Sequence, residues 1–258
     1  MSPGDALSHL PAGPDPDTFP GGVGFSMLQV YDWPAADGRS GGSPHLHTAS
    51  AEGYVVLEGT GAVQTVSGDG AAEHALAPGV VLWFTPGTVH RLVSTGDLRL
   101  MVVMQNSGLP EAGDAVLTFP TEVLADPAAY AAAAAASTGE DARRRRDLAM
   151  TGYAELLRGG PEALTAFHRA AARLVAPRAG AWQQLWRDRP LAQAERTGRH
   201  LAALAAGDPA HLAGATVRTA DAFPGQRFGM CGRLSVWDLD GHHVAAAPAL
   251  PGSTPSAG

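Results

Sequence analysis

The sequence contains no lysine, because all 18 of its basic residues are arginine. A lysine is needed for a Schiff base, for a pyridoxal-phosphate anchor and for the Walker phosphate-binding loop, so these mechanisms are excluded. Exclusive use of arginine is typical of a GC-rich bacterial genome. The net charge is −7, and no basic stripe is interleaved with aromatic residues, so we expect no nucleic-acid partner.

Cysteine and long apolar runs are scarce as well. Cys231 stands alone, which excludes intramolecular disulfides and thiolate metal clusters, and we interpret it as a small buried hydrophobic residue. No apolar run approaches the ~18 residues of a membrane span. The first residues also lack the basic and apolar regions of a secretory signal. We therefore expect a cytoplasmic protein that does not bind membranes.

The composition changes along the chain and divides it into five segments. Residues 1–22 are rich in Pro, Gly and Asp and predict an irregular arm. Residues 23–120 carry short apolar runs separated by turn residues, which predicts a β-sandwich or barrel. The predicted strands cover residues 24–31, 53–57, 62–66, 80–84, 90–93 and 98–105.

Residues 121–206 have the pattern of a helical extension instead. Helices are predicted at 127–136 and 140–158, and a third begins at Pro161 after a Gly-Gly break. Two more helices precede and follow Pro190. Residues 207–244 are predicted to form a loop and, at 232–239, a strand that returns to the sheet; residues 245–258 read as a loose tail.

Two segments of the β region carry the residues that indicate chemistry. His45 and His47 are two positions apart, so on a strand both imidazoles point to the same side. Glu52 follows after a short turn and could reach the same point. His90 follows a second turn that contains Pro86. Three imidazoles and one carboxylate are suited to one divalent transition metal.

These segments resemble the two sequence motifs of cupins. The first motif, G-x5-H-x-H-x3,4-E-x6-G, is matched by His45, His47, Glu52 and Gly59. The second, G-x5-P-x-G-x2-H-x3-N, is matched by Gly79, Gly87 and His90. Arg39, Thr85 and Ser94 replace the remaining motif residues, and none of the three positions is a metal ligand in the motif. The resemblance covers about residues 24–105.

The resemblance implies a compact bacterial single-cupin protein with a C-terminal helical extension. The fold would be mainly β with an α extension: an RmlC-like jelly-roll β-barrel (a double-stranded β-helix), then the helical region and the returning strand. One divalent metal, which would be Fe, Mn, Ni or Zn, would be bound inside the barrel. The ligands carried over from the motif are His45, His47, Glu52 and His90.

Cupins with this ligand set are often oxygenases, so the resemblance implies a dioxygenase-type oxidoreductase with a small-molecule substrate. Glu52 would act as a ligand or a proton acceptor. Tyr54 shares its strand parity and would orient substrate or move a proton, or else pack in the core. The alternatives are a metal-dependent isomerase, epimerase or lyase, and a non-enzymatic small-molecule-binding protein. We also expect a homodimer.

Four further interpretations concern residues around this centre. Trp83 and Phe84 are neighbours on a predicted strand, so one side chain must face the interior of the barrel and the other must face outward. Glu111 and Asp114 lie in a polar loop and could reach the mouth of the barrel, but we expect both to be exposed. Trp182 and Trp186 form an apolar ridge that would dock on the barrel or on a second subunit. The helical region would thus shield the barrel or build a dimer interface.

Overall fold

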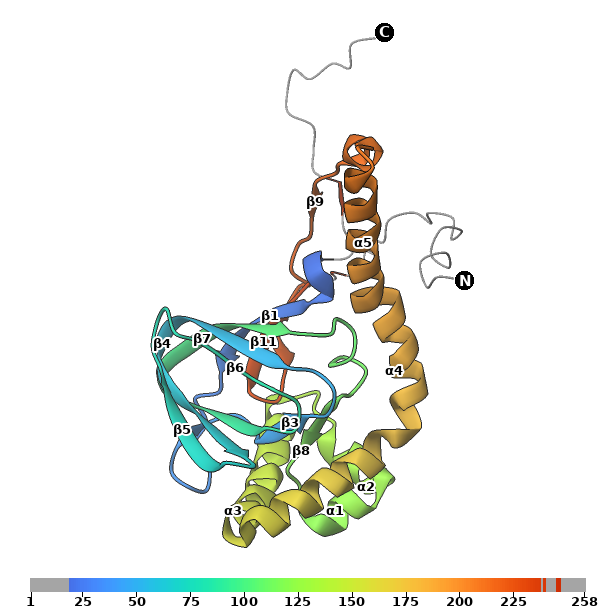
Figure 1. Ribbon diagram of the computed structural model, residues 1–258. Helices are drawn as coiled ribbons and strands as arrows, with labels where there is room; N and C mark the ends of the chain where they lie inside the picture. The colour runs from blue at the N-terminus through green and yellow to red at the C-terminus, as the bar shows by residue number, and fades with distance from the viewer. Residues whose placement is uncertain (1–18, 238, 240–244, 247–258) are drawn as a thin grey trace.

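The computed structural model describes residues 19–237, 239 and 245–246. A β-barrel lies beside a layer of helices, and a helical arm runs along one side of the barrel and beyond it (Figure 1). The predicted arm at residues 1–22 and the tail at 245–258 therefore lie largely outside the described residues. No helix within the described part of the chain is long and apolar enough to cross a membrane.

Ten strands of the described residues form one antiparallel hydrogen-bonded network that folds on itself as the barrel. They are β1 (Gly24–Val30), β2 (Ser40–Gly41), β3 (His45–His47), β4 (Glu52–Ser67), β5 (Gly70–Leu76), β6 (Val81–Phe84), β7 (Val89–Met104), β8 (Ala115–Leu117), β10 (Arg227–Phe228) and β11 (Gly232–Val236). Strands β9 (Arg218–Thr219) and β12 (Ala245–Ala246) pair separately, away from the barrel.

Strands β4 and β7 are long and bend, so that each contributes to both sheets of the barrel. Their pairing shifts register between Val56 and Gly61, where Gly59 has a φ of 75°. Before the bend β4 also pairs with β6, and after it β4 pairs with β5. The sequence analysis divided each of these strands in two. The strands predicted at 53–57 and 62–66 are both parts of β4, and those predicted at 90–93 and 98–105 are both parts of β7.

The predicted returning strand is confirmed. Strand β11 pairs with β1, and β10 adds one more strand beyond it. A Cβ added at Gly232 would lie 2.7 Å from the carbonyl carbon of Gln29, so the two strands approach too closely there for any other residue. One of the two sheets of the barrel, which we call the first sheet, therefore has the strand order β6, β4, β7, β1, β11, β10.

The helical region is also confirmed, and it follows the barrel strands as predicted. Its helices are α1 (Thr121–Ala125), α2 (Pro127–Ala134), α3 (Gly139–Val175), α4 (Ala179–Trp186) and α5 (Ala192–Ala205). Short helical turns are η1 (Pro20–Gly22), η2 (Ala176–Arg178), the π-helical η3 (Arg187–Leu191) and η4 (Ala210–Gly214). Thr138 and Asp141 form a capping box that begins α3, and α3 is kinked at Gly160, the expected break.

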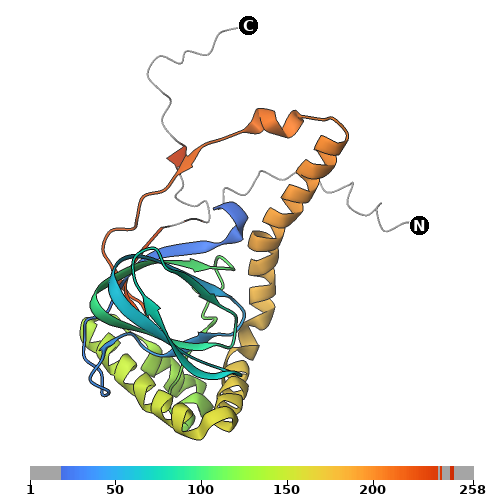
Figure 2. The ribbon, with the colours of Figure 1, turned by 60° about the vertical axis from the view of Figure 1, so that its left-hand side comes forward.

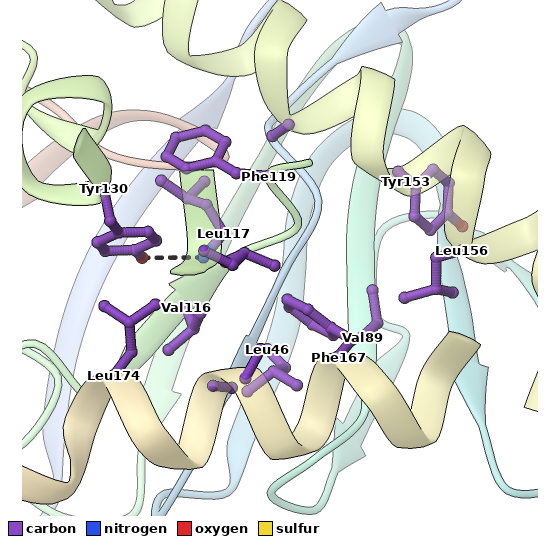
Figure 3. Close-up of a cluster of buried hydrophobic side chains, with 14 of the residues drawn as sticks. Leu46, Val89, Val116, Leu117, Phe119, Tyr130, Tyr153, Leu156, Phe167 and Leu174 are labelled. Carbon is purple, nitrogen blue, oxygen red and sulfur yellow. Dashed lines mark hydrogen bonds between the residues drawn. The ribbon is translucent and has the colours of Figure 1, made fainter. Parts of the chain in front are cut away.

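The helices cover the outer face of the second sheet, which is formed by β3, β8 and the adjoining halves of β4 and β7 (Figures 1 and 2). Leu46, Val89 and Val116 of this sheet pack against Phe167 and Leu174 of α3 (Figure 3). Leu117 N donates a hydrogen bond to the hydroxyl of Tyr130 at 3.1 Å. One core therefore joins helices and sheet, and the helical region shields this side of the barrel.

Candidate metal centre

The four residues predicted as metal ligands meet inside the barrel. His45 and His47 lie on β3, His90 lies on β7 beside His45 in register, and Glu52 begins β4. One ligand atom from each residue can be chosen so that all lie within 4.8 Å of one another. All four side chains are buried. Strand alternation explains the arrangement, because Leu46 between the two histidines points the other way, into the helix-facing core.

Each imidazole is oriented by a contact of its Nδ1 atom. His45 Nδ1 lies 3.0 Å from the carbonyl oxygen of Ser43, and His90 Nδ1 lies 3.2 Å from that of Thr88. His47 Nδ1 lies 3.3 Å from Oδ1 of Asp114. When the Nδ1–H of each neutral imidazole donates to its oxygen, the lone pair of the ring lies on Nε2. The surrounding backbone and Asp114 thus prepare three Nε2 atoms as ligands.

Two of the three Nε2 atoms lie beside the Glu52 carboxylate. His90 Nε2 lies 3.1 Å and His47 Nε2 lies 3.2 Å from Oε2 of Glu52. Neither Glu52 Oε2 nor His90 Nε2 has a hydrogen-bond partner of normal geometry, although both are buried. Buried polar atoms without partners are costly, and a cation at their centre would satisfy them together. The donor set and its geometry therefore fit a divalent transition metal.

The electrostatics of His45 and Glu52 favour the protonation states that ligands require. Burial, followed by the neighbouring imidazoles of His90 and His47, lowers the pKa of His45 well below its usual range. Burial alone would raise the pKa of Glu52, but His90 and His47 outweigh it and hold that pKa well below its usual range. A neutral imidazole and an ionised carboxylate are the metal-binding forms. His47 differs: burial acts to lower its pKa, but the hydrogen bonds to Asp114 and Glu52 outweigh burial and raise that pKa to about 10, so a metal would displace a proton from this imidazole.

Asp114 contacts the centre through His47, a role that the sequence analysis did not assign to it. Both loop carboxylates were expected to be exposed; Glu111 is exposed, but Asp114 is fully buried, so for Asp114 the expectation was wrong. Its Oδ1 accepts a hydrogen bond from the backbone N of Thr48 at 2.8 Å as well as facing His47. The reason is pairing of β8 with β3, which places Ala115 opposite His47. That long-range pairing leaves no local signal.

The interior around the centre is mostly apolar, with two protic groups. Tyr54 is fully buried and points inward as Glu52 does, with its ring centroid 5.5 Å from that of Phe84. Phe84 packs against His90, while Trp83 is 73% exposed, which settles which of the two faces inward. The Cys231 thiol, which arrives just before β11, lies beside the Tyr54 hydroxyl. Burial first, then the charge of Glu52, raises the pKa of both groups.

Comparison with known proteins agrees with this architecture. The family model of the cupin domain matches residues 35–104, and this segment contains all four metal-ligand candidates. The chain therefore contains a cupin domain, as the two motifs indicated. The match ends before the helical region begins. No curated protein matches the sequence.

Several solved structures are similar to part of the chain. The capsular polysaccharide assembling protein CapF from Staphylococcus aureus is 16% identical with a TM-score of 0.28, and the match covers 36% of this chain and 27% of that chain. A B. subtilis oxalate decarboxylase variant is 18% identical with a TM-score of 0.33, covering 40% and 28%. The TDP-quinovose 3,4-ketoisomerase WlaRB from Campylobacter jejuni is 10% identical with a TM-score of 0.30, covering 36% and 67%. None is close enough to indicate a reaction.

Proposed function

We propose that the chain is a metal-dependent enzyme that acts on a small organic molecule, and that its reaction is that of an oxygenase. The observation that carries the proposal is the convergence of three imidazoles and one carboxylate in an apolar, buried interior. His45, His47, Glu52 and His90 would hold the metal. A bound Fe, Mn or Ni would supply Lewis acidity and redox chemistry toward O2.

The side chains around the ligands would limit the chemistry at this centre. Phe84 and Met104, the register partners of Glu52 on β6 and β7, are apolar and would exclude water from one side. Tyr54 keeps its proton at neutral pH because burial raises its pKa, so it would orient a substrate by donating a hydrogen bond. It would not act as a base. An oxygenase reaction that needs no protein base fits these surroundings best.

The second candidate is a metal-dependent isomerase, epimerase or lyase. One observation favours it: the buried Tyr54 hydroxyl has no hydrogen-bond partner of normal geometry and stands on the same strand face as Glu52. A hydroxyl and a carboxylate on one face could donate and accept the proton that such reactions move. No O2 would be consumed, and Zn or Mn would suffice.

Oxygen uptake separates the two candidates. The chain loaded in turn with Fe(II), Mn(II), Ni(II) or Zn(II) would be screened in an oxygen electrode against catechols, thiols and cyclic diketones, with chelator-treated protein as the control. Metal-dependent O2 uptake, with ¹⁸O from ¹⁸O2 in the product, is expected. Turnover without O2 uptake would support the isomerase or lyase. Binding without turnover under either condition would leave a small-molecule-binding protein.

A further inference from the structure

One side of the candidate metal centre is more accessible than the others. His90 is fully buried and His45 is 3% exposed, whereas the side chains of His47 and Glu52 keep 8% and 7% of their surface exposed. These two residues end β3 and begin β4, and residues 48–51 join them. This loop, which we call the ligand loop, therefore covers the less deeply buried side of the metal-ligand group.

A groove of about 360 Å³ lies against the ligand loop. One wall is formed by the barrel and the loop that follows β7: Ala49, Gln105, Asn106 and Leu109. The other wall is formed by helix α4: Ala179, Trp182, Gln183 and Trp186. Helix α4 stands beside this end of the barrel in both ribbon views (Figures 1 and 2). The volume is within the range of small-molecule sites.

Hydrogen bonds tie the barrel wall of the groove to the ligand loop. Gln105 accepts a hydrogen bond from Ala51 N through its Oε1 at 3.1 Å, and its own backbone N donates to Ala51 O at 3.0 Å. Asn106 Nδ2 lies 3.3 Å from both Ala49 O and Ser50 Oγ. Residues 49–51, which lead from β3 to Glu52, are thus held by two residues of the groove wall.

The opposite wall is fixed in position by its own contacts. Trp182 is buried, and its indole N–H donates to Ala112 O at 3.4 Å. Arg178, one turn earlier, donates to Gly113 O at 3.2 Å. Trp182 of the expected tryptophan ridge thus docks on the loop between β7 and β8. Trp186, next along the ridge, remains 42% exposed and is the indole open to a ligand.

The lining defines the kind of molecule that fits. It contains two indoles, three carboxamides and no charged side chain. Indole rings favour flat rings by stacking or edge contacts. Carboxamides donate and accept hydrogen bonds without requiring charge. A neutral, planar ring with hydroxyl or carbonyl substituents matches these properties.

We propose that this groove binds the substrate, that the substrate is a neutral planar ring compound with hydrogen-bonding substituents, and that Trp186 selects it. This inference rests on the proposed function, because it takes the molecule bound in the groove to be the substrate of the metal centre. Helix α4 lies beyond the cupin match, so the helical region supplies the recognition surface and the barrel supplies the ligands.

Binding of a simple ring tests the groove without relying on turnover. The full chain is titrated with resorcinol, a flat ring with two hydroxyl groups, and with 1,3-cyclohexanediol, its puckered counterpart, by saturation-transfer NMR. Resorcinol should bind more tightly, and Trp186→Ala should weaken it about three- to tenfold. Leu201→Ala, which removes an apolar side chain 63% exposed on α5 outside the groove, should change binding by less than about twofold.

The outcomes separate this inference from the proposed reaction. Equal binding of the two rings, no resorcinol binding, or binding unchanged in Trp186→Ala would each overturn the groove proposal. The titration is repeated with EDTA and with one equivalent of Zn²⁺; resorcinol binding should persist in both. Loss of binding in EDTA would overturn the groove site by placing the ring on the metal. Ring binding that depends on Trp186, together with no O2 uptake in the oxygen-electrode screen, would refute the proposed oxygenase reaction and leave the groove proposal standing.

Discussion

At the scale of single residues, the candidate metal centre depends on atoms that are not themselves candidate ligands. The Nδ1 contacts of His45, His47 and His90 fix the direction of each Nε2. Two of the contacts are to backbone carbonyl oxygens, which substitution cannot remove. The third is to Asp114, which can be changed while every metal ligand stays in place.

Asp114→Asn should weaken metal binding about 10–100-fold, because the amide orients His47 less firmly and removes a charge that makes the imidazole more basic. Competition for Zn²⁺ with a chromophoric chelator measures the change. Glu111→Gln, which alters an exposed carboxylate of the same loop, is the matched control and should leave the affinity unchanged. Equal affinity in Asp114→Asn and wild type would show that Asp114 does not hold His47.

Arg91 and Asp37 make a second residue-scale prediction, which concerns pH. Arg91 is fully buried and donates to Asp37 at 2.5 and 3.2 Å. Burial acts to raise the pKa of Asp37, but the Arg91 hydrogen bond and charge outweigh it and the pKa is lowered. The folded state therefore binds fewer protons than the unfolded state at this carboxyl. Its stabilisation is present above the ordinary pKa of 3.8 and is lost as the pH falls through the lower folded-state pKa.

Asp37→Asn should consequently destabilise the protein by about 2 kcal/mol at pH 7, because a buried guanidinium loses its charged partner. The difference from wild type should shrink as the pH falls below about 4. Urea unfolding across this range measures both effects. Glu58→Gln, which breaks the exposed pair with Arg99, should cost less than about 0.5 kcal/mol. A pH-independent difference would contradict the assignment of Asp37.

At the scale of elements, strands β4 and β7 and helix α3 determine where the centre lies. The bend in β4 and β7 wraps two sheets around the ligands, and α3 supports the outside of the histidine-bearing sheet. Gly152 of α3 faces residues 118 and 119, and a Cβ added there would lie 2.6 Å from the carbonyl carbon of Phe119. The helix and the chain that follows β8 are thus in direct backbone contact.

Gly152→Ala should lower stability by about 1–3 kcal/mol despite the higher helix propensity of alanine, because neither backbone can move away freely. Gly198→Ala is the matched control, since an added Cβ in α5 meets nothing within 4 Å. That control should stabilise the protein by up to about 1 kcal/mol. Thermal unfolding of both variants measures the contrast. Similar effects in the two would show that α3 does not pack closely on the segment after β8.

The sequence predicted which four residues meet inside the barrel, because their signal is local. Spacing of two on a strand is enough to place His45 and His47 on one side, and turn residues bring Glu52 and His90 to it. The predicted strands at 53–57 and 62–66 were separated, whereas the strand bends between them and continues. Strand β5 was missed because six of its seven residues are exposed and no apolar alternation marks it. Asp114 depends on pairing between β3 and β8, which no local pattern encodes.

At the scale of the whole molecule, the two faces of the barrel differ. The second sheet is covered by the helices of the same chain. On the outer face of the first sheet, Val81 is 59% and Trp83 is 73% exposed, and Phe25, Met101 and Val103 are partly buried beside them. The exposed pair of Glu58 and Arg99 borders this surface with both charge signs. Contiguous apolar surface of this kind is typical of an interface.

We propose that a second copy of the chain covers this face, because apolar sheet faces pack on one another and one face with a balanced rim can meet itself about a twofold axis. Wild-type protein should be a dimer in light scattering at micromolar concentration. Trp83→Asp should be a folded monomer, because a charge at the centre of the interface would be buried without a partner. A wild-type monomer, or a dimer that survives Trp83→Asp, would contradict this interface.

The metal content of the chain tests the central claim most directly. Protein purified without chelators, and then loaded with Fe, Mn, Ni and Zn in turn, would be measured by elemental analysis beside His45→Ala, with circular dichroism to confirm that the variant is folded. The arrangement of His45, His47, Glu52 and His90 predicts about one equivalent of metal per chain in wild type and its loss in the folded variant. Wild-type protein that stays metal-free under every loading condition would contradict the claim, as would a folded His45→Ala that binds metal as tightly as wild type.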